Sequence, residues 1–103
     1  MFEQLKNIFG SGPAEDFADL VKKGAQIVDV RTREEFSSGH VRGSINIPLN
    51  DLSRQLARIN KSKPVIVCCA SGVRSGSAKS MLASKGYEVY NGGGWSSLQR
   101  KIG

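Results

Sequence analysis

Short runs of apolar residues recur along this chain, and segments with helical spacing separate them. Residues 65–68 form the strongest run because none of their side chains is polar; residues 27–30 form a second, and residues 44–47 and 87–90 fit two shorter strands. Runs that are apolar on both sides of the strand alternation are typical of parallel strands covered on both faces. The alternation of strands with helices predicts a small α/β domain with a central, mostly parallel sheet of four to five strands and helices on both faces.

The segments between the strands carry helical spacing and capping residues. The first expected helix runs from Pro13 to Gly24, with Phe17, Leu20 and Val21 on its apolar face, and the second is capped by Thr32 and ends at Gly39. A third is capped by Asn50 or Asp51 and runs through Leu52, Leu56 and Ile59. A fourth covers residues 75–85 and is stopped by Gly86, and a terminal helix with Trp95 and Leu98 follows a turn at residues 92–94. We expect residues 1–12 to form a short helix and linker, and residues 13–103 to form the domain.

Cysteine and histidine are scarce in this chain of 103 residues. The two cysteines are adjacent and too few for a disulfide scaffold, so we expect no disulfides. Together with His40 they supply at most three zinc ligands, so we expect no metal site. The length suits one domain with a substantial core. No targeting segment is apparent, and no apolar stretch approaches the roughly 18 residues that span a bilayer. We therefore expect a cytoplasmic protein with no membrane partner.

The formal net charge of +6 lies in the second half of the chain, where residues 52–103 hold nine basic residues and a single acidic one, Glu88. A basic surface attracts anions. The basic residues are scattered and are not interleaved with aromatic residues, which argues against nucleic acid as a partner. Small anions are the simpler expectation.

The segment that carries chemistry follows the strongest strand. It reads Cys69-Ala70-Ser71-Gly72-Val73-Arg74-Ser75, and a helix is expected to begin directly after it. This position places Cys69 at the carboxyl edge of the sheet, beneath a helix N-terminus whose backbone amides and dipole favour an anion. Together with the charge of Arg74, this environment predicts a lowered pKa for the Cys69 thiol.

A thiolate at this position can act as a nucleophile toward an anionic electrophile that the same amides bind. Gly72 permits the backbone conformation that the loop needs, and the hydroxyls of Ser71 and Ser75 can add donors. The alternative is that Cys69 is only a buried core residue. Its neighbour Cys68 points to the other face of the strand, and we expect it to be a core residue.

Four separate motifs make the chain resemble the single-domain rhodaneses, a family of sulfurtransferases. They are residues 27–31 with 34–36, residues 39–48, the loop from Cys69 to Arg74, and residues 90–95. The resemblance implies that Cys69 takes a sulfane sulfur from thiosulfate or a persulfide and passes it to cyanide, a thiol or a protein acceptor. It also implies that amides of residues 70–75 hold the outer sulfur, that Arg74 orients the donor, and that no cofactor is needed.

Other residues in the matching motifs are expected to act structurally. We expect Asp29, Arg31 and Glu35 to form a network of ion pairs and hydrogen bonds. We expect His40 to have a structural role and Trp95 to be a packing residue in the core or at its rim. The role of Arg42 stays open.

Two alternative functions remain. One is a non-catalytic docking or sulfur-carrier module, members of which commonly lack the cysteine. The other is a phosphatase or arsenate reductase, in which a longer loop separates cysteine from arginine. The sequence leaves the physiological donor and acceptor open, and also whether the protein is a monomer or a homodimer.

Overall fold

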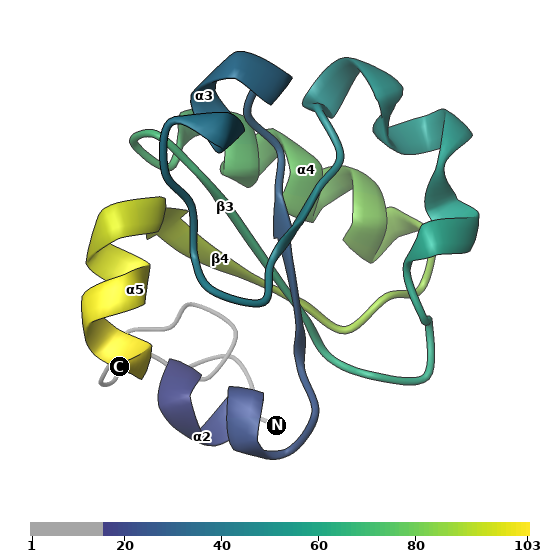
Figure 1. The fold of residues 1–103 in the computed structure, drawn as a ribbon. Coiled ribbons are helices and arrows are strands. Elements are labelled where there is room, and N and C mark those ends of the chain that lie inside the picture. The colour runs from purple at the N-terminus through teal and green to yellow at the C-terminus, as the bar shows by residue number, and fades with distance from the viewer. Residues whose placement is uncertain (1–15) are drawn as a thin grey trace.

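A parallel sheet forms the centre of the computed structural model, which describes residues 16–103 (Figure 1). Within these residues four strands lie in the order β2-β1-β3-β4, and every neighbouring pair is parallel. Their bounds are Gln26–Asp29 for β1, Ile45–Asn46 for β2, Val65–Cys69 for β3 and Val89–Gly94 for β4. The predicted α/β class and the mostly parallel sheet are confirmed.

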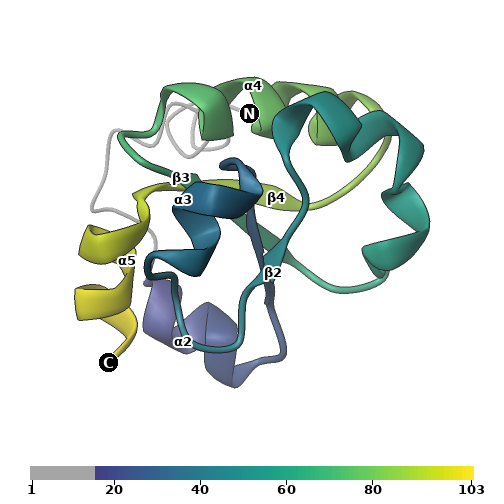
Figure 2. The same ribbon diagram turned by 45° about the horizontal axis from the view of Figure 1, so that its top comes forward.

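Helices cover both faces of the sheet, as expected (Figures 1 and 2). On one face lie α2 (Phe17–Lys22) and α5 (Trp95–Ile102). On the other lie α4 (Val73–Ser84) and two 3-10 helices, η1 (Leu49–Arg54) and η2 (Leu56–Arg58). The short helix α3 (Arg33–Ser37) follows the carboxyl end of β1. No helix of residues 16–103 combines the length and the apolar character needed to cross a membrane.

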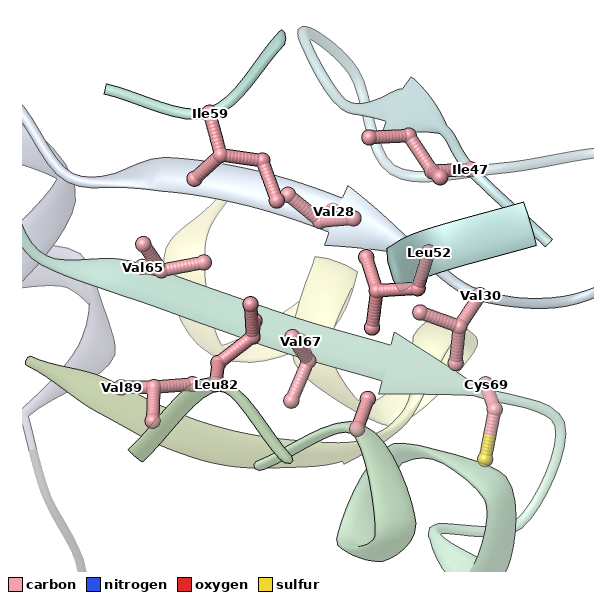
Figure 3. Packing of buried hydrophobic residues seen from close by; sticks show 11 residues of the cluster. Val28, Val30, Ile47, Leu52, Ile59, Val65, Val67, Cys69, Leu82 and Val89 are labelled. Atoms are coloured by element: carbon pink, nitrogen blue, oxygen red, sulfur yellow. The ribbon is translucent and has the colours of Figure 1, made fainter. Parts of the chain in front are cut away.

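The central strand β3 is buried at all five positions, and its side chains alternate between two hydrophobic clusters. Val65, Val67 and Cys69 face α4 and η1, with Leu82 and Leu52 packed against them (Figure 3). Ile66 and Cys68 face α2 and α5, in a cluster built with Phe17, Ile27, Val41 and Leu98. The two adjacent cysteines therefore lie on opposite faces, and Cys68 is a core residue as predicted.

Helix α3 begins where the sequence predicts, at a capping box. The Thr32 hydroxyl accepts from the Glu35 amide at 3.2 Å, and the Glu35 carboxylate accepts from the Thr32 amide at 2.9 Å. Helix α2 begins at Phe17, after an Asp16 cap. The expected start at Pro13, the short helix and linker of residues 1–12, and their boundary with the domain lie outside the described residues.

The helix expected from residue 50 to Ile59 was wrong in type, because η1 and η2 are 3-10 helices. Neither Asn50 nor Asp51 caps it, since the segment starts one turn earlier, after Pro48. The apolar residues come three apart, at Leu49 and Leu52 and again at Leu56 and Ile59. In a 3-10 helix residues three apart share one face, so two short turns bury Leu52 and Ile59 and pack the half-buried Leu49 and Leu56 against the same cluster.

The last strand was predicted at residues 87–90 with a glycine turn after it, whereas β4 runs from Val89 to Gly94 and includes those glycines. A β-bulge lies here, because Val67 pairs with Asn91 and Cys68 with Gly93. A Cβ at Gly92 would lie 2.9 Å from side-chain atoms of Ile66 and Leu98. Gly92 thus lets Leu98 of α5 pack directly onto the sheet.

Candidate active site

Cys69 is the last residue of β3, and its sulfur lies at the N-terminus of α4 (Figure 3). The Gly72 amide donates a hydrogen bond to Sγ at 3.0 Å and the Ser75 amide donates another at 3.3 Å. The thiol contacts the Ser75 hydroxyl oxygen at 3.3 Å. Cys69 is only 1% exposed, so these protein groups replace most of the water around the sulfur.

The loop conformation depends on Gly72, which has a φ of +102° and stands at the cap position of α4. This left-handed conformation is strained for a residue with a side chain. No side chain caps α4, so the amides of its first turn are free to face the loop. Gly94 of β4 lies against the loop too, because a Cβ there would be 2.8 Å from the Ala70 carbonyl oxygen.

Asn91 of β4 ties the loop to the sheet. The buried Ser75 hydroxyl donates to Asn91 Oδ1 at 2.7 Å, and Asn91 Nδ2 donates to the Gly72 carbonyl at 3.2 Å. The Gly93 amide also donates to Oδ1, at 2.9 Å. Asn91 was noted in the sequence only as part of a matching motif, and its contact with two residues of the loop was missed.

The two cysteines differ in acidity. Burial, the largest single influence on Cys69, opposes ionisation, but hydrogen bonding with the Ser75 side chain and hydrogen bonds from the amides of Ser75, Gly72 and Ser71 together outweigh it and lower the pKa of the Cys69 thiol. Burial and then the charge of Asp29 raise the pKa of Cys68 to about 12. Of the two thiols, Cys69 alone has an environment that favours a thiolate.

We expect the alkylation of Cys69 by iodoacetamide to have its pH midpoint below that of an ordinary cysteine. The midpoint moves to lower pH because the pKa of the thiol is lowered, and a more acidic thiol keeps its reactive thiolate form as the pH falls. Ser75→Ala should raise the midpoint, since the Ser75 hydroxyl can rotate from Asn91 Oδ1 and donate to Sγ once the thiol ionises. Ser77→Ala, an exposed serine of the same helix, serves as the control. A Ser75→Ala midpoint equal to that of the control would contradict this assignment.

Arg74 lies at the rim of this site and is already paired. Its Nη1 donates to Glu35 Oε1 at 2.7 Å and its Nη2 donates to Oε2 at 3.0 Å. Both side chains are 36% exposed, so the pair can meet solvent and small ligands. The resemblance implied that Arg74 orients the donor, but the sequence did not indicate its partner Glu35. Because a guanidinium has five N–H donors, this end-on contact leaves the Nε–H and further N–H groups of Arg74 available.

The network expected around Asp29, Arg31 and Glu35 is present. Arg31 donates to the buried Asp29 carboxylate through Nε at 3.0 Å and Nη2 at 2.7 Å. Its guanidinium also reaches the carbonyl oxygens of Gly39 at 2.7 Å and Glu35 at 3.1 Å. The network fixes the turn after β1 and holds α3 beside the site.

The remaining residues singled out in the sequence lie around this network or away from the sulfur. His40 stacks on Phe36 and its Nδ1 lies 2.7 Å from the Phe36 carbonyl oxygen. Trp95 packs over Arg31, whose guanidinium carbon is 4.9 Å from the ring centroid. Arg42 is exposed, and its amide donates to Gln99. Within the part of the chain that the structure describes, no cluster of His, Cys, Asp or Glu could hold a metal ion.

Comparison with known families and proteins identifies the class. The model of a family described as "Rhodanese-like domain" matches residues 13–101. The chain therefore belongs to the rhodanese-like domain family, in agreement with the resemblance of its sequence motifs.

Several curated relatives are similar over most of the chain. It is 33% identical over 89 residues to the thiosulfate sulfurtransferase GlpE of Pseudomonas savastanoi, covering 85% of this chain and 84% of GlpE. It is 41% identical over 70 residues to the thiosulfate sulfurtransferase PspE of Escherichia coli, covering 65% and 67%. It is 42% identical over 78 residues to the uncharacterized protein YqhL of Bacillus subtilis, covering 75% of this chain and 61% of YqhL.

Solved structures share the fold. A rhodanese-like domain protein from Staphylococcus aureus has a TM-score of 0.69 and 31% identity, covering 80% of this chain and 86% of that one. A rhodanese with anions from E. coli has a TM-score of 0.67 and 38% identity, covering 72% and 91%. CoADR-RHD of Bacillus anthracis has a TM-score of 0.71 and 36% identity, but the 82% of this chain that matches spans only 15% of that protein.

Proposed function

We propose that this protein is a sulfurtransferase that carries a sulfane sulfur on Cys69. The observation that carries the proposal is the position of Sγ at the carboxyl end of β3, where the Gly72 and Ser75 amides converge on it and the pKa is lowered. Relatives named thiosulfate sulfurtransferase support the proposal. The amides and side chains that we assign to the substrate belong to the loop, namely Ala70, Ser71, Gly72, Val73, Arg74 and Ser75.

The proposed reaction has two steps. The Cys69 thiolate attacks the outer sulfur of thiosulfate, the sulfur–sulfur bond of the donor breaks, and sulfite leaves with the electron pair. The product is a Cys69 persulfide anion. A thiophilic acceptor, such as cyanide or a thiol, then attacks the outer sulfur of the persulfide and releases the Cys69 thiolate. In each step negative charge is present on a sulfur atom in the site. The loop amides already face this position, so they stabilise the charge without having to reorganise.

No general base and no cofactor enters this scheme. The thiolate forms because of its hydrogen bonds, and His40 is engaged with Phe36. The amides of Gly72 and Ser75 donate to Sγ and the amide of Ser71 helps to lower its pKa, so the amides of Ala70, Val73 and Arg74 would serve the outer sulfur or the donor. A compartment that keeps thiols reduced, such as the cytoplasm, would keep Cys69 available.

Arg74→Ala should raise the KM for thiosulfate by about ten- to hundredfold, with a smaller change in kcat, because a charge-assisted hydrogen bond contributes about 1.5–3 kcal/mol. The measurement is steady-state formation of thiocyanate from thiosulfate and cyanide. Lys79→Ala is the matched control, since Lys79 is an exposed basic residue of the same helix. An unchanged KM would remove Arg74 from donor binding.

The same assay separates the proposal from its alternatives. A wild-type protein that is folded but forms no thiocyanate would favour a docking module. Cys69-dependent hydrolysis of an aryl phosphate would favour a phosphatase. We expect neither, because the chain retains Cys69 and Arg74 and has only four residues between them.

A further inference from the structure

The Glu35 carboxylate is a fixed negative charge at the rim of the Cys69 site. Its Oε1 accepts from the Thr32 amide at 2.9 Å and from the Thr32 hydroxyl at 3.1 Å, as part of the capping box of α3. The Glu35 carbonyl is held separately by Arg31, which is anchored on the buried Asp29. The carboxylate is therefore positioned by the amide and hydroxyl of Thr32 and is not a freely moving surface group.

This carboxylate meets the one arginine of the loop. Both of its oxygens accept from Arg74, so the pair has no net charge, although Arg74 alone would be a cation at the rim. The Arg74 hydrogen bond, followed by that from the Thr32 amide, lowers the pKa of Glu35 to about 2, so Glu35 stays ionised at any working pH. An incoming anion that approaches the free edge of Arg74 consequently also meets the charge of Glu35.

We infer that Glu35 is a specificity-determining residue that disfavours dianionic sulfur donors relative to monoanionic or neutral ones at the Cys69 site. The inference rests on the proposed function. Its physical basis is that the Coulomb energy between Glu35 and a donor scales with the donor's charge. Thiosulfate carries two negative charges, whereas an alkyl persulfide carries one or none. Glu35 also holds Arg74 in place, so a variant that keeps the charge but alters this contact is needed beside one that removes the charge.

Glu35→Gln is the decisive variant because it removes the charge while glutamine can still complete a capping box. The persulfide of 2-mercaptoethanol and thiosulfate are compared as donors with one acceptor, cyanide. The ratio of kcat/KM for thiosulfate to kcat/KM for the persulfide should rise about three- to tenfold, the effect of one unit charge at short range in a partly hydrated site. Glu34→Gln removes an equal charge from the exposed neighbouring position and should change the ratio less than about twofold.

A second variant separates the effect of the charge from a general loss of activity caused by altered structure. Glu35→Asp keeps the charge but shortens the side chain, so its ratio should stay near the wild-type value even if both rates fall. A ratio that is unchanged or lower in Glu35→Gln, or that rises equally in Glu35→Asp, would overturn the inference and leave the proposed function intact. Failure of the wild-type protein to use either donor would instead overturn the proposed function.

Discussion

Replacing Cys69 by serine is expected to abolish thiocyanate formation, with a loss of at least about a thousandfold, because the nucleophile itself is removed. A serine hydroxyl is nearly un-ionised at neutral pH and cannot form a persulfide. The substitution is close in size, and the Gly72 and Ser75 amides can still donate to the hydroxyl oxygen. The variant should therefore fold, and its circular dichroism spectrum and unfolding midpoint check that it does.

Cys68→Ala is the matched control for this variant. Cys68 is the adjacent cysteine, but it points into the other hydrophobic cluster and its thiol is held protonated by burial. Its replacement should leave the rate within about threefold and cost about 1 kcal/mol of stability through lost packing. Retained activity in Cys69→Ser together with lost activity in a folded Cys68→Ala would reverse the assignment of the nucleophile.

The largest expected effect on stability comes from Arg31→Ala. Asp29 is completely buried and Arg31 is 4% exposed, and the two form an ion pair with a 2.7 Å contact. Removing the arginine leaves the carboxylate buried without its partner, which is expected to lower the free energy of unfolding by about 3–5 kcal/mol. The substitution also removes the hydrogen bond to the Gly39 carbonyl oxygen and the contact with the Trp95 ring, and both contacts hold the turn after β1 in place.

Urea denaturation measures this effect. Arg33→Ala, two residues along the chain, is the control because Arg33 is exposed, and its midpoint should stay near that of the wild type. The double substitution Asp29→Asn with Arg31→Ala should recover part of the loss, since asparagine brings no uncompensated charge. A decrease below about 1 kcal/mol for Arg31→Ala alone would show that the buried pair does not brace the fold.

The pattern of apolar residues was sufficient to predict a mostly parallel sheet, although not the order of its strands. A strand such as β3, apolar on both faces, requires cover on both sides, and this requirement predicted the helical layers as well. The capping box of Thr32 and Glu35 is local in sequence, so α3 could be predicted to within two residues at its end.

Features that depend on tertiary packing could not be predicted. The three glycines of β4 have the local character of a turn, and the sequence does not show that Gly92 lies against Leu98 or Gly94 against the Ala70 carbonyl oxygen. Likewise, a 3-10 helix at Leu49–Arg54 is chosen by burial of Leu52 and not by local propensity.

The same division applies to the site. Cys69, Gly72 and Ser75 lie within one loop, so their convergence followed from the expected strand-to-helix junction. The partner of Arg74 did not, because Glu35 is 39 residues away and nothing local indicates that a helix-capping carboxylate will also accept from the loop. Long-range pairs of this kind depend on the order of strands β1 and β3, which the sequence does not specify.

The intact mass of the folded protein after treatment with thiosulfate and removal of excess donor tests the central claim most directly. We predict an increase equal to one sulfur atom, which is located on Cys69 by peptide mapping, is absent in Cys69→Ser and disappears when cyanide is added. A folded wild-type protein whose mass does not change, or that gains its sulfur on Cys68, would contradict the account.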